Sequence, residues 1–266
     1  MTAARRRRLR VFITGASSGI GAALAREYAA QGAILGLLGR RADALHALPF
    51  SADHHVYAVD VTDHAALAAA AADFIAREGG ADIVIVIASA GVSAGTLTER
   101  PDDLSWFAEI FAINVTATVA TFAPFVETMK RREVDDRGPR RLVAIGSVAG
   151  IRGMKGAGAY CASKSAVHTY AESLRLELQP HGIRVVTIAP GYIDTPMTRQ
   201  NRFPMPFLMP VDRFAAAAAR AIDAGTSYRV IPWPMGVVAK VLRLLPNVLF
   251  DALFAHAPTK SGKVAP

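Results

Sequence analysis

Short apolar runs alternate with longer helical patterns along most of the chain. The run at residues 81–91, ADIVIVIASAG, has no regular polar positions, which is typical of a strand buried on both faces of a sheet. The runs that predict strands are residues 9–14, 33–39, 55–61, 81–91, 140–147, 183–191 and 228–232. The patterns that predict helices are residues 21–32, 64–79, 104–132 and 157–182.

Strands that alternate with helices favour parallel pairing, because each helix carries the chain back to the edge of the sheet where the next strand begins. We therefore predict a single-domain α/β Rossmann fold, with a doubly wound, mostly parallel sheet of about seven strands and helices on both faces. The length of 266 residues and the apolar content of 52% suit one large domain over residues 1–266. Residues 192–212 hold four prolines, fit neither period, and are predicted to form a substrate lid.

The two ends of the chain differ from the regular pattern. The net charge is +8, and part of the excess lies in RRRRLR at 5–10, within a basic tail at residues 1–9. Such a run can contact nucleic acid or anionic lipid. We favour a solvated tail and expect no nucleic-acid partner, because no aromatic-rich basic surface follows it. The apolar extension at 233–266 is interrupted by charges and a proline, so we expect it to be amphipathic and not to span a membrane.

The single cysteine, Cys161, excludes an intramolecular disulfide and fits a reducing compartment. No apolar stretch with a small-residue cleavage site follows the N-terminal arginines, so we expect no secretory signal. Together these features predict a cytoplasmic protein.

A glycine-rich turn, TGASSGIG at residues 14–21, joins the first predicted strand to the first predicted helix. Gly15 allows a tight turn, and Gly19 and Gly21 let the backbone approach a ligand, so the helix N-terminus can receive a pyrophosphate. Part of this stretch, GASSG, also matches the nucleophile turn of hydrolases. That alternative needs a histidine after a late strand, and the chain places none there.

The second predicted strand ends in Gly39, Arg40 and Arg41 without an acidic residue. An acid at this point binds the ribose 2′-hydroxyl of NAD, whereas an arginine accommodates the 2′-phosphate of NADP. The pair therefore favours NADP(H) over NAD(H). The alternative is that both arginines cap a loop and pair with Asp43.

The stretch YCASK places Tyr160 and Lys164 four residues apart on one predicted helix, so both side chains lie on the same face. A free phenol has a pKa near 10, and a nearby ammonium or helix N-terminus favours the phenolate. The spacing can thus build a tunable proton donor, although it also fits a tyrosine packed on a solvated lysine. Ser147 ends the fifth strand, at the sheet edge where ligands bind. Asn114 is polar within an apolar helical run and could instead mark a kink.

In combination, these motifs resemble the short-chain dehydrogenase/reductase family, in order and in spacing, over most of residues 10–200. The resemblance implies that Asn114, Ser147, Tyr160 and Lys164 are catalytic. It also implies that Asp60 and Val61 hold the adenine, and that Ile193 and Thr195 contact the carboxamide. The predicted cofactor contacts are Gly15, Ser17, Ser18, Gly19, Ile20, Gly21, Arg40, Arg41, Asp60, Val61, Ala90, Gly91, Tyr160, Lys164, Pro190, Gly191, Ile193 and Thr195, and no metal ligand is predicted.

One motif departs from the family pattern. The family often has Asn-Asn-Ala-Gly after the fourth strand, where this chain has Ala88-Ser89-Ala90-Gly91. The hydrogen bonds of those asparagines are therefore not expected here, although Ala90 and Gly91 still let the backbone approach a cofactor.

The expected activity is that of an NADP(H)-dependent oxidoreductase that transfers hydride between nicotinamide and a carbonyl or secondary alcohol. The Met- and Phe-rich lid predicts a bulky, apolar substrate. The alternative is a non-catalytic NADP(H)-binding regulatory or scaffold protein. The resemblance also implies a homodimer or homotetramer. The apolar extension could line the pocket, cover an interface or, as a less favoured alternative, contact a membrane surface.

Overall fold

The computed structural model describes residues 8–49, 53–77, 84–131, 139–201 and 203–256. Seven strands pair in the order β3-β2-β1-β4-β5-β6-β9, and every pairing is parallel. The strands are β1 (Arg10–Thr14), β2 (Ile34–Gly39), β3 (His54–Ala58), β4 (Val84–Ala88), β5 (Arg140–Ile145), β6 (Arg184–Pro190) and β9 (Tyr228–Ile231). The predicted Rossmann sheet of about seven strands is confirmed. The predicted basic tail at residues 1–9 lies outside the described residues, apart from Arg8 and Leu9.

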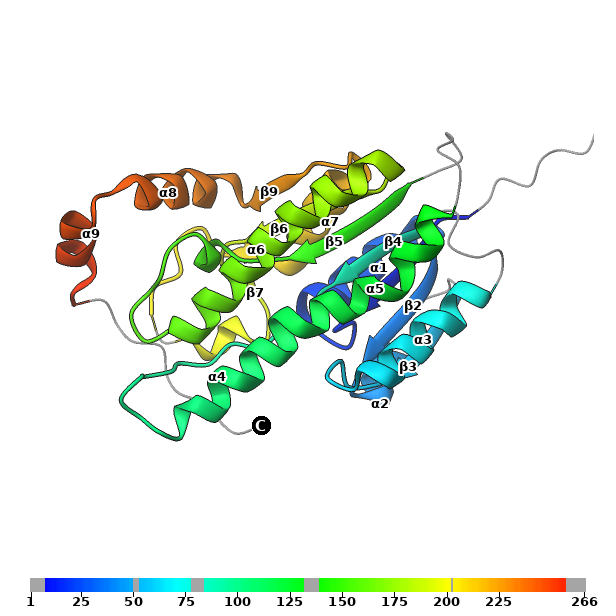
Figure 1. The fold of residues 1–266 in the computed structure, drawn as a ribbon, viewed down its shortest axis with the longest axis horizontal. Coiled ribbons are helices and arrows are strands. Elements are labelled where there is room, and N and C mark those ends of the chain that lie inside the picture. Colours follow the sequence, from blue (N-terminus) through cyan, green and yellow to red (C-terminus); the bar gives the residue numbers. More distant parts are fainter. Residues whose placement is uncertain (1–7, 50–52, 78–83, 132–138, 202, 257–266) are drawn as a thin grey trace, which may run out of the picture.

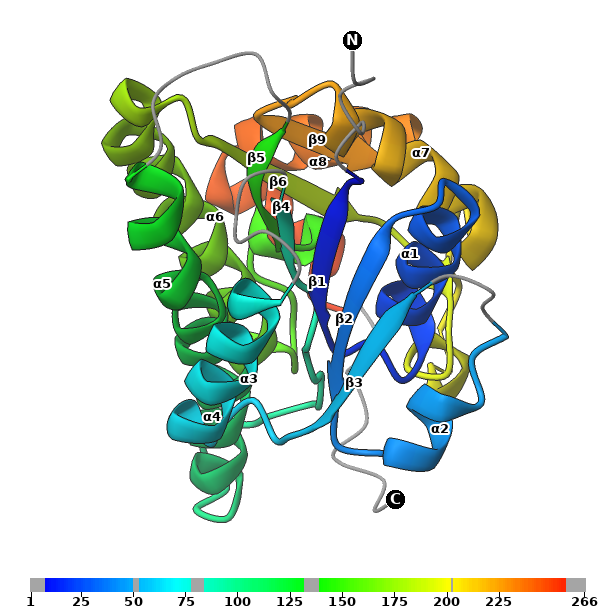
Figure 2. The ribbon, with the colours of Figure 1, turned by 90° about the vertical axis from the view of Figure 1, so that its right-hand side faces the viewer.

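Helices cover both faces of this sheet (Figures 1 and 2). One face carries α1 (Gly19–Ala30) and α7 (Val211–Asp223), which pack against each other. The other face carries α3 (His64–Ala76), α4 (Asp103–Phe111), α5 (Ala117–Lys130) and α6 (Gly158–Leu178). A separate apolar core fills each side, with Leu24 and Phe214 on the α1 side and Phe74 and Phe122 on the α5 side. The central strands β1 and β4 are buried throughout, as their apolar runs predicted.

The long helical pattern at residues 104–132 forms two helices joined by a π-helical turn, Ala112–Thr116. Pro124 lies inside α5 without ending it. The whole run Asp103–Lys130 is long and apolar enough to cross a membrane, but 44% of its most apolar window is buried in the fold. Phe122 and Phe125 pack fully buried against the sheet, so this run is a core helix of the Rossmann layer.

Several elements were not predicted. The short helix α2 (Ala42–His46) follows β2, and α7 begins at the end of the predicted lid. Within the lid segment, β7 (Ile193–Asp194) pairs with β8 (Met209–Pro210) in a small parallel sheet. The predicted amphipathic extension forms α8 (Trp233–Leu244) and α9 (Asn247–Phe254), which make up one end of the molecule in Figure 1.

Candidate active site

A cavity of about 480 Å³ opens at the carboxyl ends of the central strands. This is the position at which open parallel sheets bind ligands, and the volume lies within the range of small-molecule sites. Every predicted cofactor contact lines the cavity, and so does Ser147. The other lining residues, which are not among the predicted catalytic or cofactor contacts, are Gly39, Val59, Ser89, Val92, Ile113, Ile145, Gly146, Pro196, Met197 and Thr198.

The glycine-rich turn forms the floor of the cavity below the N-terminus of α1, whose N-cap is Ser18. Gly15 has a φ of +67°, and a Cβ at this residue would lie 2.8 Å from the Ala90 backbone. A Cβ on Gly21 would lie 2.3 Å from the Gly15 carbonyl oxygen. The turn therefore closes only with glycine at Gly15 and Gly21, which leaves an open cradle facing the helix N-terminus. This cradle fits the pyrophosphate of a dinucleotide.

Two arginines and an aspartate border the cavity at the end of β2. The Arg40 side chain is 68% exposed and lies 3.8 Å from the Asp60 carboxylate. Arg41 donates to the Ser17 carbonyl oxygen at 3.2 Å, so it helps to hold the glycine-rich turn. Burial alone would raise the pKa of the Asp60 carboxyl, but hydrogen bonds from the backbone amide and the hydroxyl of Thr62, with the charge of Arg40, lower it. Neither arginine has a described ion pair with Asp43.

Ser147 and Tyr160 both line the cavity, and their side chains form a hydrogen bond. Ser147 follows β5, and its hydroxyl accepts from the Ala149 amide at 3.1 Å. A hydrogen bond with Ser147 lowers the pKa of the Tyr160 phenol, but burial raises it more. The net direction is upward, opposite to the lowering expected from Lys164 and the helix N-terminus. Tyr160 is the third residue of α6, and burial is the largest cause of the shift in its pKa.

Lys164 lies deep below the tyrosine. Its ammonium donates to the Ile145 carbonyl oxygen at 2.9 Å and lies 6.0 Å from the centroid of the Tyr160 ring. Burial lowers the pKa of Lys164 to about 8, so most of the side chain remains charged at pH 7. Tyr160 and Lys164 therefore lie on one face of α6, as predicted, and the carbonyl oxygen at the end of β5 holds the Lys164 ammonium in place.

Asn114 lies beside the cavity but does not line it. Its side chain pairs with the Val92 backbone, accepting from the amide at 2.9 Å and donating to the carbonyl at 3.0 Å, and it also donates to Ser163 at 2.9 Å. The π-helical turn places this buried amide between the loop after β4 and α6. Asn114 thus joins the two segments that carry Gly91 and Tyr160.

His168 was not predicted at the site, yet its ring lies directly behind Ser147. The Ser147 amide donates to His168 Nε2 at 3.3 Å. Burial lowers the pKa of His168 to about 4, so the imidazole is neutral at pH 7 and can accept this hydrogen bond. The ring also makes an edge contact with Tyr228, with centroids 5.5 Å apart. In the sequence, only the position of His168 one helical turn after Lys164 indicated that it could lie at the site. Its contact with Ser147 could not be predicted, because the two residues are 21 positions apart.

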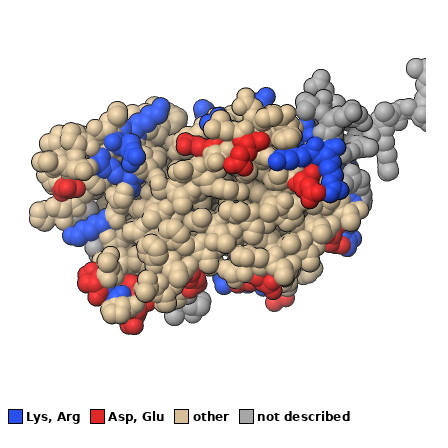
Figure 3. Space-filling view, viewed as in Figure 1, with Lys and Arg blue, Asp and Glu red and all other residues tan. Residues whose placement is uncertain are grey.

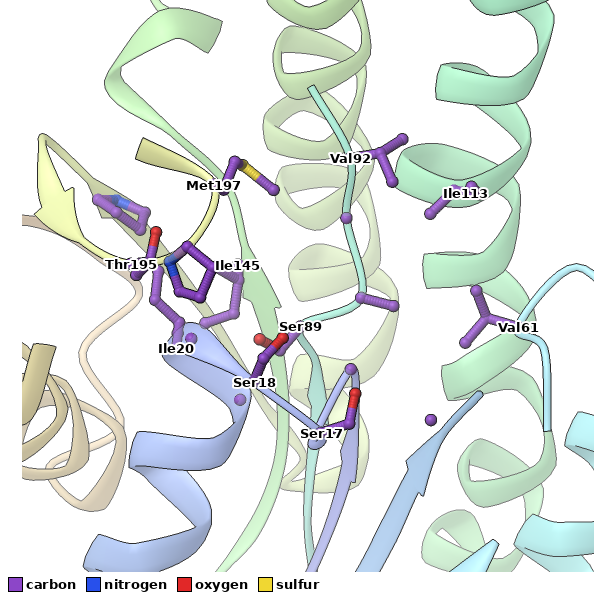
Figure 4. A pocket seen from close by; sticks show the side chains of 18 of the residues that line it. Ser17, Ser18, Ile20, Val61, Ser89, Val92, Ile113, Ile145, Thr195 and Met197 are labelled. Atoms are coloured by element: carbon purple, nitrogen blue, oxygen red, sulfur yellow. The ribbon is translucent and has the colours of Figure 1, made fainter. Parts of the chain in front are cut away.

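The lid contributes one wall of the cavity. Figure 4 shows Thr195 and Met197 on one side, with Val92, Ile113 and Val61 on the other. Ile193 and Pro196 of the lid also line the cavity, but its outer apolar residues do not: Phe207 is 52% exposed, and Phe203 packs on Tyr192. The extension, as far as residues 233–256 describe it, contributes no lining residue either, although Met235 packs against Gly191 at the edge of the site.

The hydrolase alternative finds no support in this geometry. Ser17 lies within the glycine-rich turn, and the described lining of the cavity includes no histidine that could act as its base.

Comparisons with known proteins agree with this arrangement. A family model described as short chain dehydrogenase matches residues 10–205. An uncharacterized oxidoreductase from Myxococcus xanthus is 37% identical over 247 residues, which cover 90% of this chain and 94% of the relative.

Solved structures show the same fold. A short chain dehydrogenase from Burkholderia cenocepacia in complex with NADP matches with a TM-score of 0.79 and 22% identity, over 95% of this chain and 99% of that one. A short-chain dehydrogenase from Sphingobium yanoikuyae in complex with NADPH matches with a TM-score of 0.74 and 25% identity, over 94% and 96%. The chain belongs to the short-chain dehydrogenase/reductase family of oxidoreductases.

Proposed function

We propose that this protein is an NADP(H)-dependent reductase or dehydrogenase acting on a carbonyl or secondary alcohol. The observation that carries the proposal is the Ser147–Tyr160 hydrogen bond at the wall of a glycine-cradled dinucleotide cavity. The NADP and NADPH complexes of the two similar structures support the choice of cofactor. When bound, the nicotinamide would supply or accept the hydride.

Each polar residue of the site has a separate task in this proposal. Tyr160 keeps its proton at neutral pH and would donate it to the substrate oxygen during reduction. Burial raises the pKa of the phenol, so this step needs the positive charge of Lys164 and of the bound nicotinamide. Ser147 orients that oxygen through its hydroxyl. Lys164 supplies positive charge below the phenol, and Asn114 holds the loop after β4 against α6. A purely regulatory protein would need no such pairing of Ser147 with Tyr160.

We propose that Arg40 selects NADP(H) through the 2′-phosphate. Its exposed guanidinium at the cavity border lies 3.8 Å from Asp60, a loose pairing that lets it turn to a phosphate. Arg40→Ala should lower the ratio of kcat/KM for NADPH over NADH by about ten- to a hundredfold, the worth of a charge-assisted hydrogen bond. Arg175→Ala, which removes an exposed arginine from the far end of α6, should leave the ratio unchanged. A wild-type preference for NADH would contradict the assignment.

We further propose a bulky, uncharged substrate. The wall beside the nicotinamide end is apolar, with Ile145, Pro196 and Met197. Arg199, which could have met a substrate carboxylate at the rim, is held by Asp194 at 2.7 Å. The other candidate cation, Arg202, lies outside the described residues.

A series of straight-chain ketones tests this pocket. Each added CH₂ that is buried should raise kcat/KM by up to about fourfold, because its transfer from water is worth about 0.8 kcal/mol. The rise should stop when the cavity is full. A flat series, or faster turnover of short charged substrates, would exclude the apolar pocket.

We also propose a cytoplasmic homodimer or homotetramer that pairs through α4, α5 and α6. These helices expose large apolar side chains on their outer faces, including Leu104, Phe107 and Leu176. Such side chains on neighbouring helices suit a shared helical interface.

A further inference from the structure

Both C-terminal helices expose large apolar side chains. On α8, Trp233, Val237, Val241 and Leu244 follow one another at helical spacing, so they share one face. On α9 three further large apolar residues are exposed. We call this set the C-terminal apolar surface, and it comprises Trp233, Val237, Val241, Leu244, Val248, Leu249 and Leu253, each between 53% and 83% exposed. Large apolar side chains scattered singly are ordinary, whereas seven on two consecutive helices indicate a contact surface.

This surface is not needed to attach these helices to the protein. The opposite faces already do so, because Met235, Ala239 and Phe250 are buried. Arg152 also donates to the carbonyl oxygens of Leu242 and Leu245 and to Asn247, and its guanidinium stacks on the Phe250 ring at 3.9 Å. One face of these helices therefore packs on the rest of the protein, and a second apolar face is exposed to solvent.

The charge around this surface is strongly one-sided. Lys240 and Arg243 are exposed on α8 itself, and Lys155 and Arg229 are exposed on adjoining segments. Between residues 227 and 256 the only acidic residue is Asp251. Figure 3 shows basic atoms along the α8 end of the molecule, with acidic atoms near α9 and, lower down, toward α4.

We infer that the C-terminal apolar surface docks on an anionic lipid bilayer. The apolar side chains would enter the boundary between headgroups and acyl chains, while Lys240 and Arg243 contact the lipid phosphates. A second copy is a poorer occupant, since a two-fold interface places the same patch on both subunits and would bring these cations together. The proposal is independent of the substrate and of the cofactor.

Vesicle sedimentation with the full chain tests the docking. Phosphatidylcholine vesicles that contain phosphatidylglycerol should bind the protein at moderate salt, and pure phosphatidylcholine vesicles should bind it much more weakly. Lys240→Gln with Arg243→Gln should lower the partition coefficient by about 25-fold, at about fivefold for each lost cation. Lys130→Gln with Arg220→Gln, which removes two exposed cations elsewhere, should change it far less.

A second pair of double variants tests the contribution of the apolar side chains to vesicle binding. Leu244→Ser with Leu253→Ser, at 83% and 67% exposure, should lower binding at least about tenfold. Phe207→Ser with Leu208→Ser, at 52% and 46% exposure in the lid, should bind vesicles like the wild type. All four variants alter exposed residues, and a circular-dichroism melt checks that each one folds.

Two results would overturn the inference. One is wild-type protein that stays in the supernatant with both kinds of vesicle. The other is a smaller mass by light scattering for Leu244→Ser with Leu253→Ser without any change in vesicle binding, because it would show that the surface joins two copies.

Discussion

Tyr160→Phe is expected to lower kcat for ketone reduction by about a thousandfold or more, with the affinity for NADPH nearly unchanged. General acid catalysis contributes about 10²- to 10⁴-fold, and this substitution removes the proton while keeping the ring. The ring stays packed on α6 beside Ser147, so the shape of the cavity should persist. Steady-state kinetics at saturating NADPH, with a fluorescence titration for binding, measure the two quantities separately.

Tyr170→Phe on the same helix is the matched control, because Tyr170 is also partly buried but does not line the cavity. It should retain wild-type kcat. If Tyr160→Phe keeps full activity, the phenol is not the proton donor and the proposed chemistry fails. Loss of NADPH binding in that variant would instead indicate that the ring holds the cofactor, and the fall in kcat could then not be assigned to proton transfer.

The sequence was most informative where function depends on local geometry. Tyr160 and Lys164 share a helix face because of their spacing alone, and the glycine-rich turn must lie at a strand end because a strand and a helix flank it. Ser147 was placed at the sheet edge by the same argument. These residues all line one cavity in the structure, since parallel strands bring their carboxyl ends together.

What the sequence could not predict depends on contacts between distant segments. The raised pKa of Tyr160 follows from burial by the complete fold, and the neutral His168 behind Ser147 needs α6 packed against the end of β5. The pairing of Asn114 with the Val92 backbone likewise joins residues 22 positions apart. No periodic pattern in the sequence predicts these contacts.

The lid and the extension show a different limit. Apolar composition predicted an apolar wall from the lid and left open whether the extension lines the pocket. In the structure most of that apolar surface lies elsewhere. Pro196 and Met197 reach the cavity, whereas Phe207 and the outer face of α8 are turned to solvent. Composition shows that a segment has apolar side chains. Whether those side chains line the cavity or are exposed to solvent depends on how the segment packs in the fold.

Gly21→Ala is the second substitution from which we expect a large effect, because the new Cβ meets backbone. It would lie 2.3 Å from the Gly15 carbonyl oxygen and 2.8 Å from the Gly15 carbonyl carbon. Neither atom can move without opening the turn, since Gly15 itself packs on the Ala90 backbone. Overpacking of this kind costs about 1–3 kcal/mol or more of folding free energy. We expect Tm to fall by about 2–10 °C.

The same substitution should weaken NADPH binding more than it weakens the fold, because the displaced turn is the proposed pyrophosphate cradle. We expect the Kd for NADPH to rise at least about tenfold, as aligned backbone N–H groups at a helix N-terminus are lost. Gly158→Ala is the control, since a Cβ at that residue would meet no described atom within 4 Å and alanine suits the start of α6. A differential scanning melt with and without NADPH compares both variants. If Gly21→Ala matches Gly158→Ala in Tm and in its shift by NADPH, the closed turn is not what holds the cofactor.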